Sequence, residues 1–240
     1  MNDTIRASLI LALMAHLACG PATPDEPTTP DSEPVDDTHE PAAVDDGMAV
    51  EGLAGTLRRD EVDPVMNRAV GRFMRCYAEQ LDERPFLLGD LALSFGVGRD
   101  GAVESVRVTT STLGSRETVD CVLDVARGLR FPTPHGGTSA TFDYGPVVFN
   151  PGDGTRPTLW ERARVNEVLD EEENAAALDE CPAVGIAVTM YIGPGGRVRS
   201  IGAVAPSPDQ EEAARCFERV LGGFEYPDPG PRVAKLSLEF

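Results

Sequence analysis

Histidine is scarce in this chain of 240 residues, which contains only three. His16 lies in an apolar leader and His39 in an acidic segment, so only His135 falls in the part expected to fold. A serine or cysteine nucleophile needs a neighbouring base, and a zinc site needs closely spaced ligands. The sequence therefore predicts no enzyme and no catalytic, cofactor-binding or metal-binding residue.

Basic residues are also few, since 21 Lys and Arg stand against 40 Asp and Glu. The resulting net charge of −19 excludes nucleic acid as a natural partner and makes anionic lipid a poor docking surface. Apolar residues make up 41% of the chain, which is enough for one large domain or two small ones to build a core.

The N-terminus resembles a bacterial lipoprotein signal peptide, residues 1–18. An apolar run from Ala7 to Ala18, too short to cross a bilayer, leads into Leu17-Ala18-Cys19-Gly20. The resemblance implies cleavage before Cys19, lipidation of that cysteine, and anchoring in a bacterial envelope facing the periplasm. Gly20 favours the outer membrane. The alternative is an ordinary secretory signal with an incidental cysteine.

Residues 19–57 are expected to form a disordered tether. From Pro21 to Asp46 the sequence "PATPDEPTTPDSEPVDDTHEPAAVDD" is rich in proline and acid, without Lys, Arg or aromatic residues. Such a segment has little apolar surface to offset its chain entropy, and its charges repel one another. Behind a lipidated cysteine, it would hold a folded part away from the membrane.

The stretch "FGVGRDGAV" contains the glycine spacing of a dinucleotide-binding loop, at Gly96, Gly98 and Gly101. Such a loop requires a helix after the third glycine. Here β-branched residues follow, and Asp100-Gly101 between two strand-like runs predicts a hairpin turn. We therefore expect no nucleotide binding.

The folded part contains an internal repeat at an offset of 95 residues. The matched pairs are Gly98 with Gly193, Gly101 with Gly196, Val103 with Val198, Cys121 with Cys216, and Phe131-Pro132 with Tyr226-Pro227. Tyr191 stands where the first copy has Gly96. The repeat predicts an α+β protein with two tandem αββαβ units, copy 1 at residues 58–152 and a divergent copy 2 at residues 158–240.

Helix starts can be predicted from capping residues. Asp63 with Pro64 predicts the start of the first helix, and Ser115 predicts the start of the second. Ser207-Pro208-Asp209-Gln210 has the pattern of a capping box before the last helix. The corresponding first helix of copy 2 is expected to be weaker and rich in glutamate.

Four cysteines lie in the repeated part, two in each copy. In an exported chain, an even count shared between repeats predicts disulfide bonds. Of the three possible pairings, the repeat favours those within each copy, Cys76 with Cys121 and Cys181 with Cys216.

The stretch "STLGSRETVDCVLDVARGLRFPTPHGG", residues 111–137, resembles the AgmX/PglI C-terminal domain, a TonB-C-like module. Residues near 60–150 resemble it well and residues 160–240 weakly. The resemblance implies an envelope lipoprotein associated with gliding motility or transport, and a sheet that accepts a partner strand along an edge. Its motifs are structural, so they support a fold better than an activity.

The function expected from the sequence is a tethered, non-enzymatic module that binds unidentified envelope proteins or has a structural role. The alternative is a periplasmic enzyme or enzyme regulator with an unrecognised site. Copy 1 is expected to be the binding copy, because it keeps the motif from Ser111 to Gly114 and the Gly136-Gly137 loop. It also has the longer connection between its first cysteine and its first strand.

Overall fold

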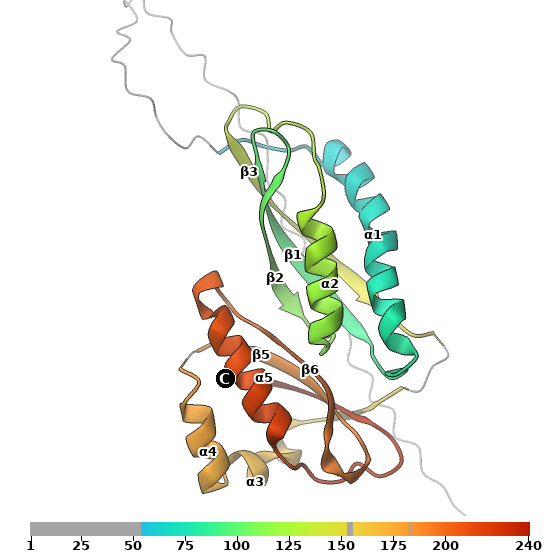
Figure 1. Ribbon diagram of the computed structural model, residues 1–240, viewed down its shortest axis with the longest axis vertical. Coiled ribbons are helices and arrows are strands. Elements are labelled where there is room, and N and C mark those ends of the chain that lie inside the picture. The colour runs from blue at the N-terminus through green and yellow to red at the C-terminus, as the bar shows by residue number, and fades with distance from the viewer. Residues whose placement is uncertain (1–53, 153–155, 183) are drawn as a thin grey trace, which may run out of the picture. The chain divides into compact units, whose positions relative to one another are not determined.

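The computed structural model describes residues 54–152, 156–182 and 184–240. The predicted signal peptide, Cys19 and the tether as far as residue 53 lie outside the described residues. From Ala54 onward the described residues belong to one compact unit that contains two β-sheets and five α-helices (Figure 1). The predicted α+β class is therefore confirmed.

The first half of this unit is a three-stranded antiparallel sheet with two helices against one face (Figure 1). Its elements are α1 (Arg59–Leu81), β1 (Gly89–Gly98), β2 (Val103–Ser111), α2 (Arg116–Arg127) and β3 (Ser139–Phe149). The strand order is β2-β1-β3, so β2 and β3 are the edges. Alternate side chains of β1, from Leu91 to Val97, are buried in the core beneath the helices, as their spacing predicts.

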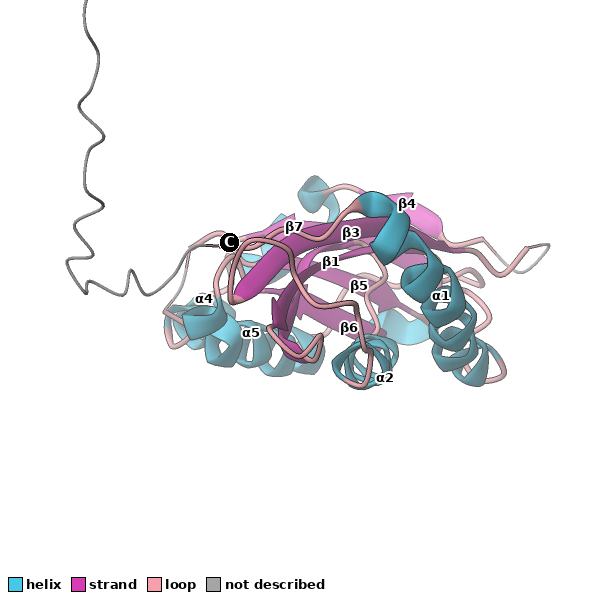
Figure 2. Cartoon of the chain, turned by 90° about the horizontal axis from the view of Figure 1, so that it is seen from above, coloured by secondary structure: helices cyan, strands magenta, loops and turns pink. Residues whose placement is uncertain are grey.

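The second half has a four-stranded sheet in the order β4-β7-β5-β6. Its elements are β4 (Thr158–Trp160), η1 (Arg162–Arg164), α3 (Asn166–Leu169), α4 (Glu172–Asp179), β5 (Ala187–Ile192), η2 (Pro194–Gly196), β6 (Val198–Val204), η3 (Pro208–Gln210), α5 (Glu211–Gly223) and β7 (Ala234–Glu239). Figure 2 shows α4 and α5 on the same side of these strands. The expected single glutamate-rich helix is instead split into η1, α3 and α4. The short strand β4 was not predicted, because three residues are too few to show an alternating pattern.

A register shift between the hairpin strands recurs at the offset of 95 residues. The β1–β2 ladder shifts register between Gly96 and Val97, and the β5–β6 ladder shifts between Tyr191 and Ile192. Each shift is a β-bulge. It accounts for the break in apolar alternation on the following strand, where Val103 is followed by Val106 in the first half and Val198 by Ile201 in the second. The stretch with the Gly-x-Gly-x-x-Gly spacing forms the β1–β2 hairpin, with β2 rather than a helix after Gly101.

The glycine at the end of each hairpin turn contacts the aromatic-proline segment of its own half. Phe131 N–H donates to the carbonyl of Gly101 at 2.8 Å, and Tyr226 N–H donates to that of Gly196 at 3.0 Å. A Cβ atom would lie 1.9 Å from the Phe131 carbonyl oxygen at Gly101, and 1.8 Å from that of Tyr226 at Gly196. Both glycines also have positive φ angles, of 76° and 72°. Only glycine fits this contact, which explains why both copies have it.

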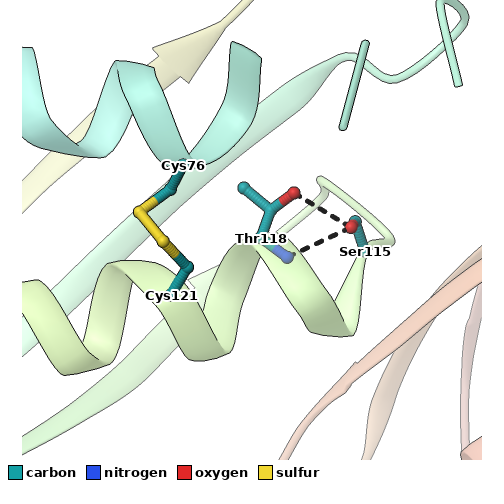
Figure 3. Close-up of a disulfide and its surroundings, with 4 residues drawn as sticks. All are labelled: Cys76, Ser115, Thr118 and Cys121. Atoms are coloured by element: carbon teal, nitrogen blue, oxygen red, sulfur yellow. Dashed lines mark hydrogen bonds between the residues drawn. A yellow bond between two sulfur atoms is a disulfide. The ribbon is translucent and has the colours of Figure 1, made fainter. Parts of the chain in front are cut away.

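Both predicted cysteine pairs lie at bonding distance in the structure. Cys76 and Cys121 join α1 to α2, with sulfur atoms 2.01 Å apart (Figure 3). Cys181 and Cys216 join the end of the α4 segment to α5, at 2.02 Å. Each pair therefore fixes two segments that pack on the same sheet.

The structure changes two of the three predicted helix starts. Helix α1 begins at Arg59 rather than at Asp63, and Pro64 lies inside it. The additional turn carries Val62, which is buried in the core, and it includes a proline that cannot donate a backbone hydrogen bond. The segment 207–210 forms a 3₁₀ turn before α5 and lacks the side-chain-to-backbone bonds of a capping box. Ser115 does cap α2, since its Oγ accepts a hydrogen bond from the N–H of Thr118 at 3.3 Å (Figure 3).

Candidate interaction surfaces

The two sheets each have one face covered by their own helices and one face turned away from them, which we call the open face. On the second sheet, alternation places Thr189 and Tyr191 of β5, Ser200 of β6 and Lys235 of β7 on the open face. These side chains are nevertheless buried, and Tyr191 has no exposed surface. Segments of the first half cover them.

The first covering segment is the connection between α1 and β1. The hydroxyl of Tyr191 donates to the Leu88 carbonyl at 2.6 Å and accepts from the Leu88 N–H at 3.0 Å. Lys235 Nζ donates to the same carbonyl at 2.8 Å. The ring of Phe86 packs on that of Tyr191 with a centroid distance of 5.2 Å. One tyrosine thus satisfies both backbone polar groups of Leu88.

The second covering segment is the turn between β2 and α2. Ser200 Oγ donates to the carbonyl of Gly114 at 2.7 Å in a buried setting. A Cβ at Gly114 would lie 2.9 Å from the side chain of Thr189, and one at Gly202 would lie 3.1 Å from the backbone nitrogen of Ser115. The two backbones approach closely because a glycine stands on each side of the contact.

An ion pair lies beside this contact. The Arg116 guanidinium on α2 donates to the Glu218 carboxylate on α5, with the shortest distance 2.7 Å. Glu218 also accepts from the N–H of Ala203 at 2.6 Å. Since the two charged side chains are only 21% and 11% exposed, the pair is a fixed part of the contact between halves rather than a surface salt bridge.

These contacts give a different role to features that had suggested partner binding by copy 1. Its longer connection supplies Phe86 and Leu88, and its Ser111-to-Gly114 motif supplies Gly114. Both contact the second half of the same chain. They therefore give no support to binding of another protein.

A groove lies between α1 and the edge strand β3, with a volume of about 900 Å³. Its wall on α1 includes Val62, Val70 and Met74, and its wall on β3 includes Tyr144 and Val148. The side chain of Val148 is 62% exposed, one of the few large apolar side chains so exposed in the part of the chain that the structure describes. This groove thus combines apolar walls with a strand edge.

The edge of β3 is interrupted in two places. Ala54 forms a parallel bridge with Ser139 at its start. Gly145 and Pro146 form a bulge, because the register with β1 moves from Val147 directly to Tyr144. Proline lacks an N–H, so the free edge is divided into residues 140–144 and 147–149. Short segments, a bulge and a proline of this kind reduce nonspecific pairing at a sheet edge.

Charge in this groove is small and mixed. Arg59 pairs with Asp63 at 3.4 Å on the exposed surface of α1. Burial, with a smaller contribution from the Asp63 charge, raises the pKa of the Tyr144 phenol. The groove therefore favours an apolar partner segment over a charged one.

His135, the histidine expected in the folded part, lies in the loop before β3, where its Nε2 is 2.8 Å from Glu61 Oε1. Hydrogen bonds from the Arg58 backbone and from His135 lower the pKa of Glu61. In the described ranges, no three His, Cys, Asp or Glu side chains gather in an arrangement that could hold a metal ion. None of the described helices has both the length and the apolar character needed to cross a bilayer.

Comparison with models of protein families, with curated proteins and with solved structures finds no match for this chain.

Proposed function

We propose that this chain is a lipid-anchored protein of a bacterial envelope that binds an extended segment of another envelope protein. The observation that carries the proposal is the groove between α1 and β3, which offers a strand edge that is unpaired among the described residues, beside apolar walls. An extended peptide can add to such an edge, with main-chain hydrogen bonds for affinity and side-chain pockets for specificity. The finer assignment, two TonB-C-like units behind a signal peptide and tether, belongs to this proposal.

The partner segment should alternate apolar and polar residues. A strand added to β3 turns alternate side chains to the same face, and on the α1 side these would meet Val62, Val70 and Met74. The remaining side chains would face solvent and can be polar. A module of this kind has no catalytic task, and the tether would give it reach from the membrane.

Peptide selection on the full chain tests strand addition. Binders from a random peptide library should share the alternating pattern and should slow amide hydrogen exchange along β3. Val148→Lys should weaken them by about tenfold or more, because a lysine on an edge strand opposes the addition of another strand. Thr110→Lys, at an exposed position on the opposite edge strand, should leave affinity within about twofold. Protection on β2 instead of β3, or equal effects of the two variants, would contradict the proposal.

The anchor is tested separately at Cys19. Growth with a fatty-acid analogue should label the wild-type protein and should not label Cys19→Ser. Cys76→Ser/Cys121→Ser is the control, since it also removes cysteines but leaves the lipidation site. Equal labelling of the wild type and Cys19→Ser would refute lipidation at this residue without affecting the strand-addition proposal.

A further inference from the structure

The open face of the first sheet is the equivalent of the surface by which the second half holds the first. At the offset of 95 residues, Ser94 corresponds to Thr189, Gly96 to Tyr191, and Ser105 to Ser200. In the second half these positions receive the backbone of Leu88 and Gly114. In the first half the same positions carry small side chains, and Ser105 is exposed.

A groove of about 870 Å³ lies over this face. One wall is the open face of β1 and β2, and the others come from α2 and from the η3–α5 segment. The residues of the sheet that line it are Ser94, Phe95, Gly96, Ser105, Val106, Arg107 and Thr141. Its size exceeds that of a single small anion and is within the range of sites that enclose a ligand.

The groove carries positive charge in an otherwise acidic chain. Five arginines line it, against the three acidic residues Asp120, Glu211 and Glu212. Arg116 is already paired with Glu218, and Arg127 with Asp124. Within the described residues, Arg107, Arg215 and Arg219 form no salt bridge. These three guanidinium groups, one on the sheet and two a turn apart on α5, are available to carboxylates.

We propose that this groove binds an acidic peptide segment of a partner protein. The equivalent face of the second half already binds peptide backbone, and the small residues at Ser94, Gly96 and Ser105 leave space for it. The arginines select carboxylate side chains. The site shares no lining residue with the α1–β3 groove, so it does not depend on strand addition at β3.

The test uses the full chain and a fluorescently labelled peptide in which Glu alternates with Ser and Gly, with a Gln-for-Glu peptide as the neutral probe. The wild type should bind the Glu peptide, more weakly as salt is raised, and should bind the Gln peptide several-fold less well. Arg215→Ala/Arg219→Ala should weaken the Glu peptide by about fivefold to tenfold. Arg68→Ala/Arg72→Ala removes the same charge from the exposed surface of α1 at the same spacing and should change affinity by less than about twofold.

A second variant tests the sheet wall without changing charge. Ser105→Trp should fill the space over Gly96 and prevent binding, whereas Thr110→Trp, exposed on the same strand but outside the groove, should not. Equal binding of the Glu and Gln peptides would overturn the proposal, as would equal effects of the two arginine pairs. If Ser105→Trp binds the Glu peptide as tightly as the wild type does, the peptide contacts α5 without the sheet, and this result would also overturn the proposal. Circular dichroism of each variant establishes that it is folded.

Discussion

The two halves share an element order but use the open faces of their sheets differently. In the second half the face is buried, and Tyr191 at its centre holds the Leu88 backbone of the first half. In the first half the equivalent position is Gly96, which lines an open groove. Glycine in one half and tyrosine in the other, on equivalent strands at the equivalent bulge, are thus one of the differences between a covered face and a face that lines a groove.

The differences between the halves are complementary. The first half supplies the two covering segments. It has the longer connection before its first strand, and it has glycine at position 114, where the backbones of the two halves meet. The second half supplies the sheet face that these segments cover. It has a short connection before β5 and larger or polar side chains on its open face. Unequal copies can therefore pack against each other in a way that two identical copies with short connections could not.

Removal of the disulfide bonds is expected to have the largest effect on stability, and it tests whether the two halves unfold together. Cys76→Ser/Cys121→Ser and Cys181→Ser/Cys216→Ser should each lower the free energy of unfolding by about 4 kcal/mol, because the closed loops are of similar length, with sequence separations of 45 and 35. If the halves unfold together, as their buried contact predicts, each variant should shift one common denaturant transition. Two separate transitions, each moved by only one variant, would show that the contact does not couple the halves.

Tyr191→Phe tests the contact itself. The variant keeps the ring but loses both hydrogen bonds with Leu88, and it should lower the free energy of unfolding by about 1–2 kcal/mol. Hydrogen exchange at the Leu88 amide should become faster. In the control Tyr226→Phe, a buried tyrosine loses its bond to the Leu221 carbonyl within the second half, so exchange at Leu88 should not change. Unchanged exchange at Leu88 in Tyr191→Phe would contradict the assigned role of Tyr191.

The smallest expected effect is at alkaline pH. Burial raises the pKa of the Tyr191 phenol, so the folded protein keeps it neutral where the unfolded chain ionises it. The stabilisation from the buried neutral phenol is complete below pH about 10 and decreases as the pH rises above that value. The stability difference between the wild type and Tyr191→Phe should therefore narrow by about 1 kcal/mol at pH about 11. A difference that stays constant or widens would contradict the burial of this hydroxyl.

Local features were largely predictable from the sequence. The hairpin at Asp100-Gly101, the cap at Ser115 and the inward face of β1 each depend on a few neighbouring residues, and the structure has all three. The start of α1 was wrong because burial of Val62 depends on a core that local capping rules do not include. The split of the expected helix into η1, α3 and α4 was not predicted, because the apolar pattern of this segment is weak.

The sequence by itself determined the α+β class and the pairing of the four cysteines, because a repeat constrains each copy by the other. Only the tertiary structure decided what the differences between copies do. Tyr191 in place of Gly96 was visible in the sequence, but its partner Leu88 is 103 residues away, and no local pattern relates the two. The grooves have the same origin, since each is enclosed by elements distant in sequence that meet only when the chain folds.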